Sequence, residues 1–253
     1  MPENTLKLAI VGYGQMGKEI ERLVNEDKRY AHCQISEIFD TDNQIDTSKD
    51  YDFDVAIEFT EPDSVLPNLE KLCKLGKNVV VGTTGWHKEM HQVEQWVEES
   101  GNGLVWATNF SVGVQMFFQL VTQLGKLVNH EAAYDIMTHE FHHRRKKDSP
   151  GGTALTIAKR LLAEIDSKKS IVTEELQRKI DKTEIHASST RGGEIFGIHM
   201  VLADSLEDTI EMTHRAKGRS GFASGSLDAA IWVSGKKGVH EFGQSLQNKW
   251  GIA

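Results

Sequence analysis

The stretch that decides the fold runs Leu6-Lys-Leu-Ala-Ile-Val-Gly-Tyr-Gly-Gln-Met-Gly17. Its first half is a short apolar run that predicts a buried strand, and its second half has the glycine spacing G-x-G-x-x-G. Apolar residues then recur at 16, 20, 23 and 24, the spacing of one helix face. Strand, glycine turn and helix in this order predict a dinucleotide-binding turn, because glycines let a pyrophosphate approach the helix N-terminus closely. The alternative is a tight turn in some other α/β protein.

The next predicted strand, Cys33–Phe39, ends in an acidic residue, Asp40. This acid comes about 20 residues after the glycine turn, where a carboxylate would bind the ribose hydroxyls of a dinucleotide. Asp40 has no arginine after it to accept a 2′-phosphate, which favours NADH over NADPH. The alternative is that Lys49 folds back to meet such a phosphate.

Short apolar strands continue to alternate with helices along the first hundred residues. Strands are predicted at 54–59, 77–81 and 103–107, with a helix over 62–75. This alternation predicts a doubly wound parallel sheet, in which ligands bind beyond the carboxyl ends of the strands. Segments 82–85 and 108–111 follow two of these strands and carry small hydroxyl residues. We expect them to face a ligand, the alternative being that they only form turns.

The pattern changes after Ser111. A long helix with a broad apolar face is predicted over 114–128, followed by segments that alternate with period two at 134–141, 185–191, 194–202 and 209–216. Together they predict a second, α+β domain carrying an open mixed sheet. A wide sheet face usually needs covering, so self-association is expected.

Residues His139–Thr153 contain the most informative cluster of side chains. His139-Glu140-x-x-His143 matches the zinc-peptidase pattern H-E-x-x-H, which requires a helix to bring both imidazoles to one metal ion. The preceding residues alternate as a strand does, and on a strand positions i and i+4 lie ~13 Å apart. We therefore predict no metal site here and keep a zinc peptidase as the rival enzyme class.

Residues 142–147 are all basic or imidazole side chains, yet the chain carries a formal net charge of −8. A local basic cluster in an acidic protein favours a small polyanionic substrate over nucleic acid or a membrane surface. Pro150-Gly-Gly-Thr153 opens a predicted helix. Glycine amides, a hydroxyl and a helix N-terminus together predict a binding site for a carboxylate.

Composition sets the remaining limits. The chain has 253 residues, 39% hydrophobic and 26% charged, which is typical of one or two globular domains. Cys33 and Cys73 form no C-x-x-C pair, which argues against a disulfide framework and a cysteine zinc site. No stretch approaches the roughly 18 apolar residues of a membrane span, and residues 1–4 show no secretory signal. We expect a cytoplasmic protein with no membrane partner.

The segment Glu140-x-His142-His143-x-x-Lys146-x-Asp148-x-Pro150-x-Gly152-Thr153-Ala154 resembles the signature of the 4-hydroxy-tetrahydrodipicolinate reductase (dihydrodipicolinate reductase) family. Two departures from the family occur: Gly151 stands where serine is usual, and the segment between Asp40 and Asp54 is shorter than in the longer members. Further family marks follow in order along almost the whole chain: Gly12 to Gly17 with Met16, Gly82-Thr83-Thr84-Gly85, Asn109-Phe110-Ser111-Val112-Gly113, Arg191-Gly-Gly-Glu194, Thr213-His214-Arg215-Ala216, Phe222-Ala223-x-Gly225 and Ala229-x-x-Trp232.

The resemblance implies that NAD(P)H reduces a cyclic unsaturated dicarboxylate to tetrahydrodipicolinate, a step of diaminopimelate and lysine synthesis. His142 and Lys146 are then the candidate acid catalysts, either of which could donate the proton. The substrate carboxylates would be held by Lys146 with His143, Gly152 and Thr153. The implied cofactor-binding residues are Val11, Gly12, Tyr13, Gly14, Gln15, Met16, Asp40, Gly82, Thr83, Thr84, Ala107, Thr108, Asn109 and Phe110.

The resemblance also implies a domain layout. A nucleotide domain would comprise residues 1–109 and 218–253, and a substrate-binding domain, residues 110–217, would build a homotetramer through its sheet. Two rivals stay open besides the zinc peptidase. One is another two-domain reductase of a small acid, which would share the glycine turn but not need His142-His143-x-x-Lys146. The other is an NADH-binding sensor without turnover.

Overall fold

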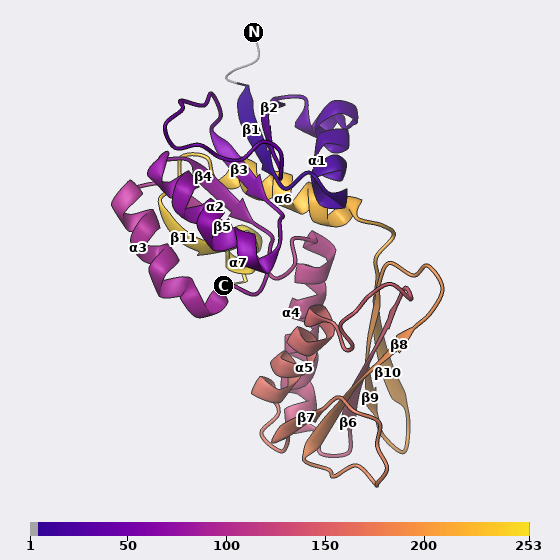
Figure 1. Cartoon of the computed structure of the whole chain (residues 1–253). Coiled ribbons are helices and arrows are strands. Elements are labelled where there is room, and N and C mark those ends of the chain that lie inside the picture. Colours follow the sequence, from indigo (N-terminus) through magenta and orange to yellow (C-terminus); the bar gives the residue numbers. More distant parts are fainter. Residues whose placement is uncertain (1–4, 253) are drawn as a thin grey trace. The chain divides into compact units, whose positions relative to one another are not determined.

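The computed structural model describes residues 5–252, which form two compact units (Figure 1). Unit 1 comprises the residues up to Ser111 together with those from Arg219 onward, and unit 2 comprises Val112–Gly218. Residues 1–4, which entered the expectation that no secretory signal is present, lie outside the described range. Among the residues that are described, no helix is long and apolar enough to cross a membrane.

Unit 1 is built on a six-stranded parallel sheet with the strand order β11-β5-β4-β3-β1-β2. Its central strands are short apolar runs that are buried along almost their whole length, as strands covered by helices on both faces must be. The predicted doubly wound parallel sheet is therefore confirmed. The strands are β1 (Leu6–Val11), β2 (Cys33–Phe39), β3 (Val55–Glu58), β4 (Asn78–Val81), β5 (Gly103–Trp106) and β11 (Gly238–Glu241).

Helices cover this sheet in two groups. Helix α1 (Gln15–Glu26) packs against α6 (Ser220–Val233), and α2 (Pro62–Lys74) packs against α3 (Met90–Ser100). Helix α7 (Phe242–Trp250) follows β11. Two short 3-10 turns, η1 (Lys28–Tyr30) and η2 (His87–Glu89), precede β2 and α3. The structure thus adds α3, α6, α7 and β11 to the elements that the sequence patterns predict.

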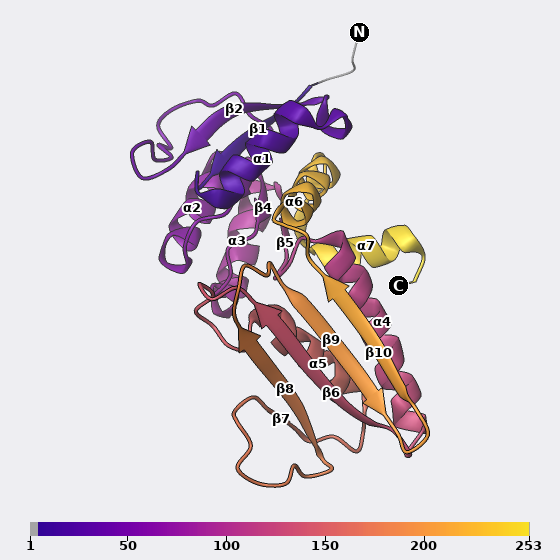
Figure 2. The same cartoon turned by 90° about the vertical axis from the view of Figure 1, so that its right-hand side faces the viewer.

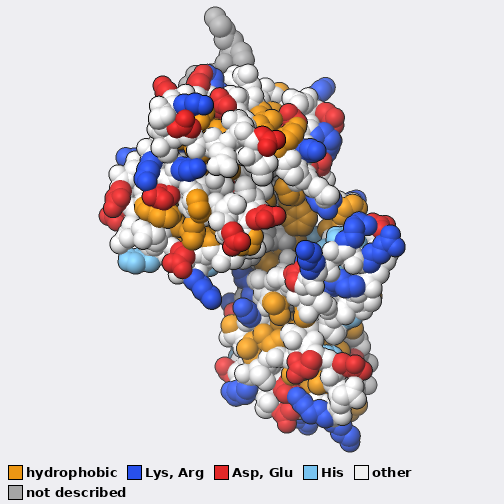
Figure 3. Space-filling model, viewed as in Figure 1, with side chains coloured by type: hydrophobic (Ala, Val, Ile, Leu, Met, Phe, Trp, Pro, Cys, Tyr) orange, Lys and Arg blue, Asp and Glu red, His pale blue; other side chains and the backbone are white. Residues whose placement is uncertain are grey.

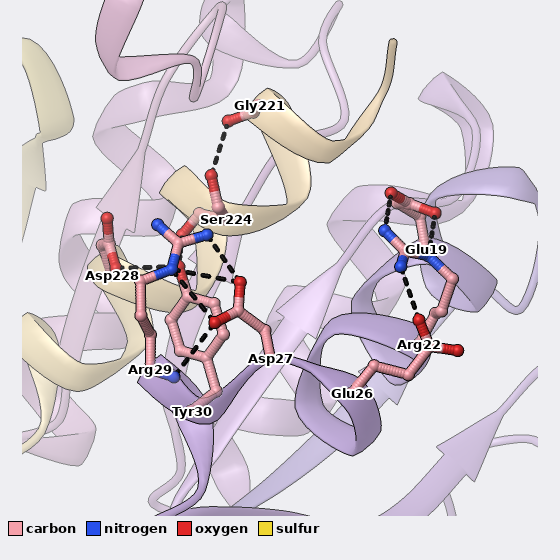
Figure 4. A network of polar contacts seen from close by, with 9 residues as sticks. All are labelled: Glu19, Arg22, Glu26, Asp27, Arg29, Tyr30, Gly221, Ser224 and Asp228. Carbon is pink, nitrogen blue, oxygen red and sulfur yellow. Dashed lines mark hydrogen bonds and ion pairs between the residues drawn. The ribbon is translucent and has the colours of Figure 1, made fainter.

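A polar network fixes the C-terminal part of unit 1 to its N-terminal part (Figure 4). The buried Tyr30 hydroxyl lies 3.1 Å from both the Ser224 carbonyl oxygen and the Asp228 carboxylate on α6. Asp27 pairs with Arg29 beside it. Strand β11 meanwhile pairs in parallel with β5, from Gly238 beside Gly103 onward. The last part of the chain therefore completes a sheet that the first part begins.

Unit 2 holds a mixed five-stranded sheet with the order β10-β9-β6-β8-β7, as the prediction of an open mixed sheet requires. Figure 2 shows this sheet face-on, with α5 behind the strands. Helices α4 and α5 pack against each other, and their buried apolar side chains form one core with the strands. The elements are α4 (Val112–His130), β6 (Asp135–His142), α5 (Gly152–Glu164), β7 (Ser170–Val172), β8 (Glu184–Arg191), β9 (Ile198–Asp204) and β10 (Thr209–Arg215).

One predicted boundary in unit 2 is wrong. The alternating pattern places a strand from Glu194, whereas β9 begins at Ile198. Gly197, the last residue before β9, has φ +149°, and Gly193, just before Glu194, has φ +55°. Such backbone conformations do not belong to a regular strand, so an extended turn replaces the first four residues of the predicted strand.

On the face drawn in Figure 3, Lys and Arg side chains lie among Asp and Glu side chains, separated by uncharged areas.

Candidate active site

The turn between β1 and α1 is tightly packed on its inner side and open at its centre. Gly12 has φ +95°, and a Cβ there would lie 2.2 Å from the Phe59 carbonyl oxygen. A Cβ at Gly17 would lie 2.5 Å from the Gly12 carbonyl oxygen, whereas one at Gly14 would meet no heavy atom within 4 Å. Side chains are thus excluded where backbone segments meet, and the helix N-terminus stays accessible at Gly14. This geometry fits a dinucleotide pyrophosphate.

The loop after β4 lies against the same part of the sheet. A Cβ at Gly82 would lie 2.0 Å from Cε1 of the Phe59 ring, so only glycine fits there. The buried Thr83 hydroxyl accepts a hydrogen bond of 2.8 Å from the Thr60 backbone N–H. The Thr83 carbonyl oxygen accepts another, of 2.9 Å, from Nε1 of Trp86. Thr84, next to it, is exposed. These bonds hold the loop in a fixed shape at the carboxyl end of the strand.

The loop after β5, Ala107–Phe110, is the third predicted cofactor segment. Ala107, Asn109 and Phe110 are buried and Thr108 is exposed. The Asn109 side-chain oxygen accepts a hydrogen bond of 2.9 Å from the Ser111 backbone N–H. Because β1, β4 and β5 run parallel in one sheet, their carboxyl ends share one edge, and the three segments lie along it.

Asp40 follows β2 at this same edge and is exposed. Its Oδ1 atom accepts hydrogen bonds from the backbone N–H groups of Asp42 (2.9 Å) and Asn43 (3.0 Å). Both bonds use Oδ1, so the carboxylate stabilises the turn that follows it while Oδ2 takes no part in these two bonds.

In unit 2, strand β6 divides the His139–His143 pattern between two faces of the sheet. Glu140 is fully buried on the face that α5 covers, whereas His139 points to the opposite face. There His139 Nδ1 lies 2.7 Å from the Ser188 hydroxyl and Nε2 lies 3.1 Å from the Thr190 hydroxyl. The strand assignment is confirmed, and His139 and Glu140 do not converge as a helical H-E-x-x-H motif requires.

Glu140 is the anchor of the buried side of the site. Its Oε1 accepts a hydrogen bond of 2.7 Å from the Gly151 backbone N–H and another from Nη2 of Arg191. Its Oε2 lies 3.3 Å from Nε2 of His199. Burial by itself would raise the pKa of this carboxyl, but the contacts from His199, Arg191 and Gly151 lower it to about 2. Glu140 is therefore ionised at neutral pH.

This arrangement refines the predicted carboxylate-binding turn. The Gly151 amide, one of the donors expected to face a substrate, already binds the protein's own carboxylate. Arg191 reinforces the turn, since its Nη2 also donates to the Asp148 carbonyl oxygen. Gly152 and Thr153 form the first turn of α5, beyond this anchor.

The two candidate acid catalysts lie at the end of β6 and in the turn that follows. Burial, together with the nearby Lys146 ammonium group, lowers the pKa of His142 to about 4. Lys146 Nζ forms an ion pair of 2.7 Å with Asp148 Oδ1. The His142 ring lies 5.4 Å, centroid to centroid, from the ring of His143. The structure therefore brings His142, His143 and Lys146 together beside the turn that leads into α5.

Glu140, His142 and His199 form a cluster whose ligand-type atoms lie within 4.8 Å of one another. Three such groups are a minimal metal-binding set. The Arg191 guanidinium group, however, already pairs with this carboxylate and would repel a further cation. We assign no metal to the cluster.

Sequence analysis missed the roles of Arg191 and His199, and it treated Glu140 only as part of two patterns. One signal was available for Glu140: the alternation along β6 puts it on the buried face, where a carboxylate needs a cation or several donors. Its side-chain partners Arg191 and His199 lie on β8 and β9, and no local pattern connects those strands to β6.

Comparison with known proteins gives consistent results. Residues 6–110 match the family model of the dihydrodipicolinate reductase N-terminus, and residues 113–246 match that of its C-terminus. A 4-hydroxy-tetrahydrodipicolinate reductase from Christiangramia forsetii is 33% identical over 237 residues, covering 92% of this chain and 95% of the relative. One from Methanoregula boonei is 40% identical over 186 residues, covering 73% and 71%.

A solved structure shows the same fold. It is the dipicolinate-bound dihydrodipicolinate reductase from Paenisporosarcina sp. TG-14, with a TM-score of 0.68 and 21% sequence identity. The similarity covers 94% of this chain and 97% of that one.

Proposed function

Because this chain belongs to the dihydrodipicolinate reductase family, we propose that its two units divide the family reaction, with unit 1 binding the cofactor and unit 2 the substrate. The activity is the NAD(P)H-dependent reduction of 4-hydroxy-tetrahydrodipicolinate to tetrahydrodipicolinate in diaminopimelate and lysine biosynthesis. The observation that carries the proposal is the convergence of His142 and Lys146 beside the Glu140-anchored turn. The proposed domains are residues 1–109 plus 218–253, and 110–217.

Unit 2 supplies the proton and the charge that the reaction needs. A bound NAD(P)H supplies a hydride, after which the reduced carbon framework must receive a proton. The ion pair with Asp148 supports a charged Lys146 as the donor, and the same charge would offset a substrate carboxylate. His142, whose pKa is about 4, is uncharged near pH 7. A dianionic substrate beside it would raise that pKa, so both residues belong to the proposed catalytic pair.

The start of α5 supplies the remaining substrate contacts in this proposal. Gly152 and Thr153 lie in its first turn, where backbone N–H groups point outward and favour an anion. A Cβ at Gly152 would meet no heavy atom within 4 Å, which leaves space for a ligand to approach the backbone. His143, next to His142, would bind the second carboxylate. The proposed ligand is a small dicarboxylate.

The cofactor would bind unit 1 along Val11–Met16, Gly82–Thr84 and Ala107–Phe110, with Asp40 at its ribose. The open space at Gly14 supports this arrangement. We propose a preference for NADH, because the exposed Asp40 carboxylate suits two ribose hydroxyls and would repel a 2′-phosphate.

We also propose a cytoplasmic homotetramer. The sheet face opposite α5 carries the apolar side chains of Met137, Met200 and Leu202, where Met137 pairs with Leu202 and Met200 pairs with His139. Met137 is 37% exposed, which supports a second copy covering this face. The buried free thiols of Cys33 and Cys73 support a reducing compartment.

The test is NADH consumption with 4-hydroxy-tetrahydrodipicolinate generated in place by its synthase from pyruvate and aspartate semialdehyde. Parallel runs use NADPH, and a control omits the synthase. We expect rapid oxidation only when the synthase is present, and faster with NADH. No oxidation with either cofactor, from folded protein that binds NADH, would overturn the substrate assignment.

A further inference from the structure

Phe59 and Thr60, the two residues that follow β3, lie between two of the proposed cofactor segments of unit 1. A Cβ at Gly12 would lie 2.2 Å from the Phe59 carbonyl oxygen, and one at Gly82 would lie 2.0 Å from the Phe59 ring. The Thr60 backbone N–H donates a hydrogen bond of 2.8 Å to the Thr83 hydroxyl. A shift of these two residues would therefore displace both the glycine turn and the loop that follows β4.

Glu58, the last residue of β3, anchors this segment from the protein interior. Its side chain is fully buried, and its Oε1 accepts hydrogen bonds from the Thr60 backbone N–H, at 3.1 Å, and from the Thr60 hydroxyl. Its second oxygen, Oε2, is buried and has no hydrogen-bond partner among the described residues. The carboxyl group thus fixes Thr60 through one oxygen and keeps the other away from solvent.

The surroundings of Glu58 supply no compensating positive charge. Its neighbours in the sheet are Val11 on β1 and Val81 on β4. The ionisable residues at the start of α2, Glu61 and Asp63, are acidic and exposed. None of the ion pairs in the part of the chain that the structure describes includes Glu58. The polar side chains that act on its carboxyl group are all uncharged and belong to Thr60, Thr83 and Asn68.

Glu58 and Glu140 are both fully buried, and their surroundings act on them in opposite directions. Contacts from Arg191 and His199 help to lower the pKa of Glu140 to about 2. Burial raises the pKa of Glu58 above its ordinary 4.5, and its uncharged neighbours offset this only in part. A buried carboxyl group without a cation favours its neutral form, because charge is costly to remove from water.

We propose that Glu58 is a positioning residue of the cofactor site and that it acts as an uncharged carboxylic acid. In this form it holds Thr60, and through Thr60 the loop at Thr83, without adding a negative charge near a bound pyrophosphate. The inference rests on the proposed cofactor site in unit 1. It adds to that site a buried residue that acts through its neighbours.

The first measurement is the Kd for NADH, from the fluorescence of bound NADH, at pH values from 6 to 9. Glutamine has nearly the shape of the protonated acid and cannot ionise, so at pH 6 Glu58→Gln should bind NADH within about twofold of wild type, whereas Glu58→Ala, which loses the anchor, should bind about tenfold more weakly. As the pH rises and Glu58 ionises, the wild-type Kd should rise by about tenfold relative to that of Glu58→Gln, because the new charge repels the pyrophosphate.

Glu70→Gln is the matched control. Glu70 lies on α2, its side chain is 41% exposed, and it forms an ion pair of 2.7 Å with Lys74. Its replacement removes a carboxylate from the same unit without touching the buried segment. We expect this variant to keep the wild-type Kd and the wild-type pH dependence.

The second measurement is denaturant unfolding without cofactor, followed by tryptophan fluorescence, since all five tryptophans belong to unit 1. An acid whose pKa is raised in the folded state stabilises that state below the unfolded-state pKa and loses this contribution as the pH rises through the folded-state value. The unfolding midpoint of Glu58→Gln should therefore increase relative to that of wild type between pH 4 and pH 8. For Glu70→Gln the difference from wild type should show no such increase.

The outcomes separate the inference from the cofactor site on which it rests. If Glu58→Gln binds NADH as weakly as Glu58→Ala at pH 6, or if its midpoint does not increase relative to wild type with pH, the uncharged acid is wrong. If every Glu58 variant binds NADH as wild type does at all pH values, the positioning role is wrong while the cofactor site stands.

A wild-type protein that binds no NADH at any pH overturns the proposed cofactor site, and the inference falls with it. Should Glu58→Ala fail to fold, the comparison of Glu58→Gln with wild type decides alone. A pH-dependent difference in both Kd and midpoint then supports the inference, and the absence of either one overturns it.

Discussion

Replacing Glu140 with glutamine removes the charge of the buried anchor while keeping its size. Glu140 is fully buried, and its partner Arg191 has only 16% of its side chain exposed. Breaking a buried ion pair by removing one partner costs about 3–5 kcal/mol, because the other charge stays buried. The fall of the Glu140 pKa from its ordinary 4.5 to about 2 corresponds to roughly 3 kcal/mol of stabilisation of the folded state at neutral pH. We therefore expect Glu140→Gln to lower the free energy of unfolding at pH 7 by about 3 kcal/mol.

The lowered pKa also predicts how the loss of unfolding free energy in Glu140→Gln depends on pH. A carboxyl whose pKa is lowered in the folded state stabilises it above the unfolded-state pKa, and this contribution disappears as the pH falls through the folded-state pKa. The difference between wild type and Glu140→Gln should thus be constant above pH 5 and should shrink between pH 4.5 and about 2.

The assay is denaturant unfolding followed by far-UV circular dichroism at pH 7, 4 and 3. Tryptophan fluorescence is unsuitable, because the five tryptophans, at 86, 96, 106, 232 and 250, all belong to unit 1 and Glu140 to unit 2. The matched control is Glu194→Gln, which removes the exposed partner of Arg145 and should change little. Two results would refute the reasoning. One is that Glu140→Gln unfolds at the same denaturant concentration as Glu194→Gln at pH 7. The other is that the difference in unfolding free energy between wild type and Glu140→Gln is as large at pH 3 as at pH 7.

Three further predictions concern the cofactor, the catalysis and unit 1. His142→Ala and Lys146→Ala should each lower kcat by about 10²–10⁴-fold with NADH affinity nearly unchanged, and full turnover by either variant removes that residue from the catalytic pair. Asp40→Ala should narrow the ratio of kcat/KM values for NADH and NADPH, since it removes the carboxylate that discriminates against a 2′-phosphate; an unchanged ratio means that another group sets it. Gly225→Ala should destabilise unit 1 by at least about 1–3 kcal/mol in fluorescence-monitored unfolding, because the new Cβ would lie 1.7 Å from the Phe110 carbonyl oxygen. Gly221→Ala, on the same helix with a nearest contact of 3.5 Å, is its control, and equal midpoints would contradict the prediction.

Local patterns were sufficient for much of the fold. The apolar run before Gly12 predicts β1, and the run ending at Phe39 predicts β2 with the bounds that the structure has. Strands β7 (Ser-Ile-Val) and β11 (Gly-Val-His-Glu) lack the continuous apolar run that predicts the similarly short strands β3, β4 and β5. Helix α6 is rich in small residues and is buried on several sides, so its sequence shows no narrow apolar face.

The candidate site also has a part that the local sequence predicts and a part that it does not. His142, Lys146, Gly152 and Thr153 lie within one short segment, and their grouping follows from the local sequence. The contact of Glu140 with Arg191 spans 51 residues and depends on the register between β6 and β8, where His142 pairs with Arg191. Such a register is set by tertiary packing.

The return of the chain to unit 1 after unit 2 has a consequence for folding during translation. Unit 2 is continuous from Val112 to Gly218, whereas unit 1 lacks α6 and β11 until residues 220–241 have been synthesised. Vectorial synthesis at about 5–20 residues per second therefore gives the internal unit time to fold first. During that interval β5 is an unprotected sheet edge, open to pairing with a neighbouring nascent chain. Truncation near residue 218 should accordingly yield aggregated protein rather than a smaller folded enzyme.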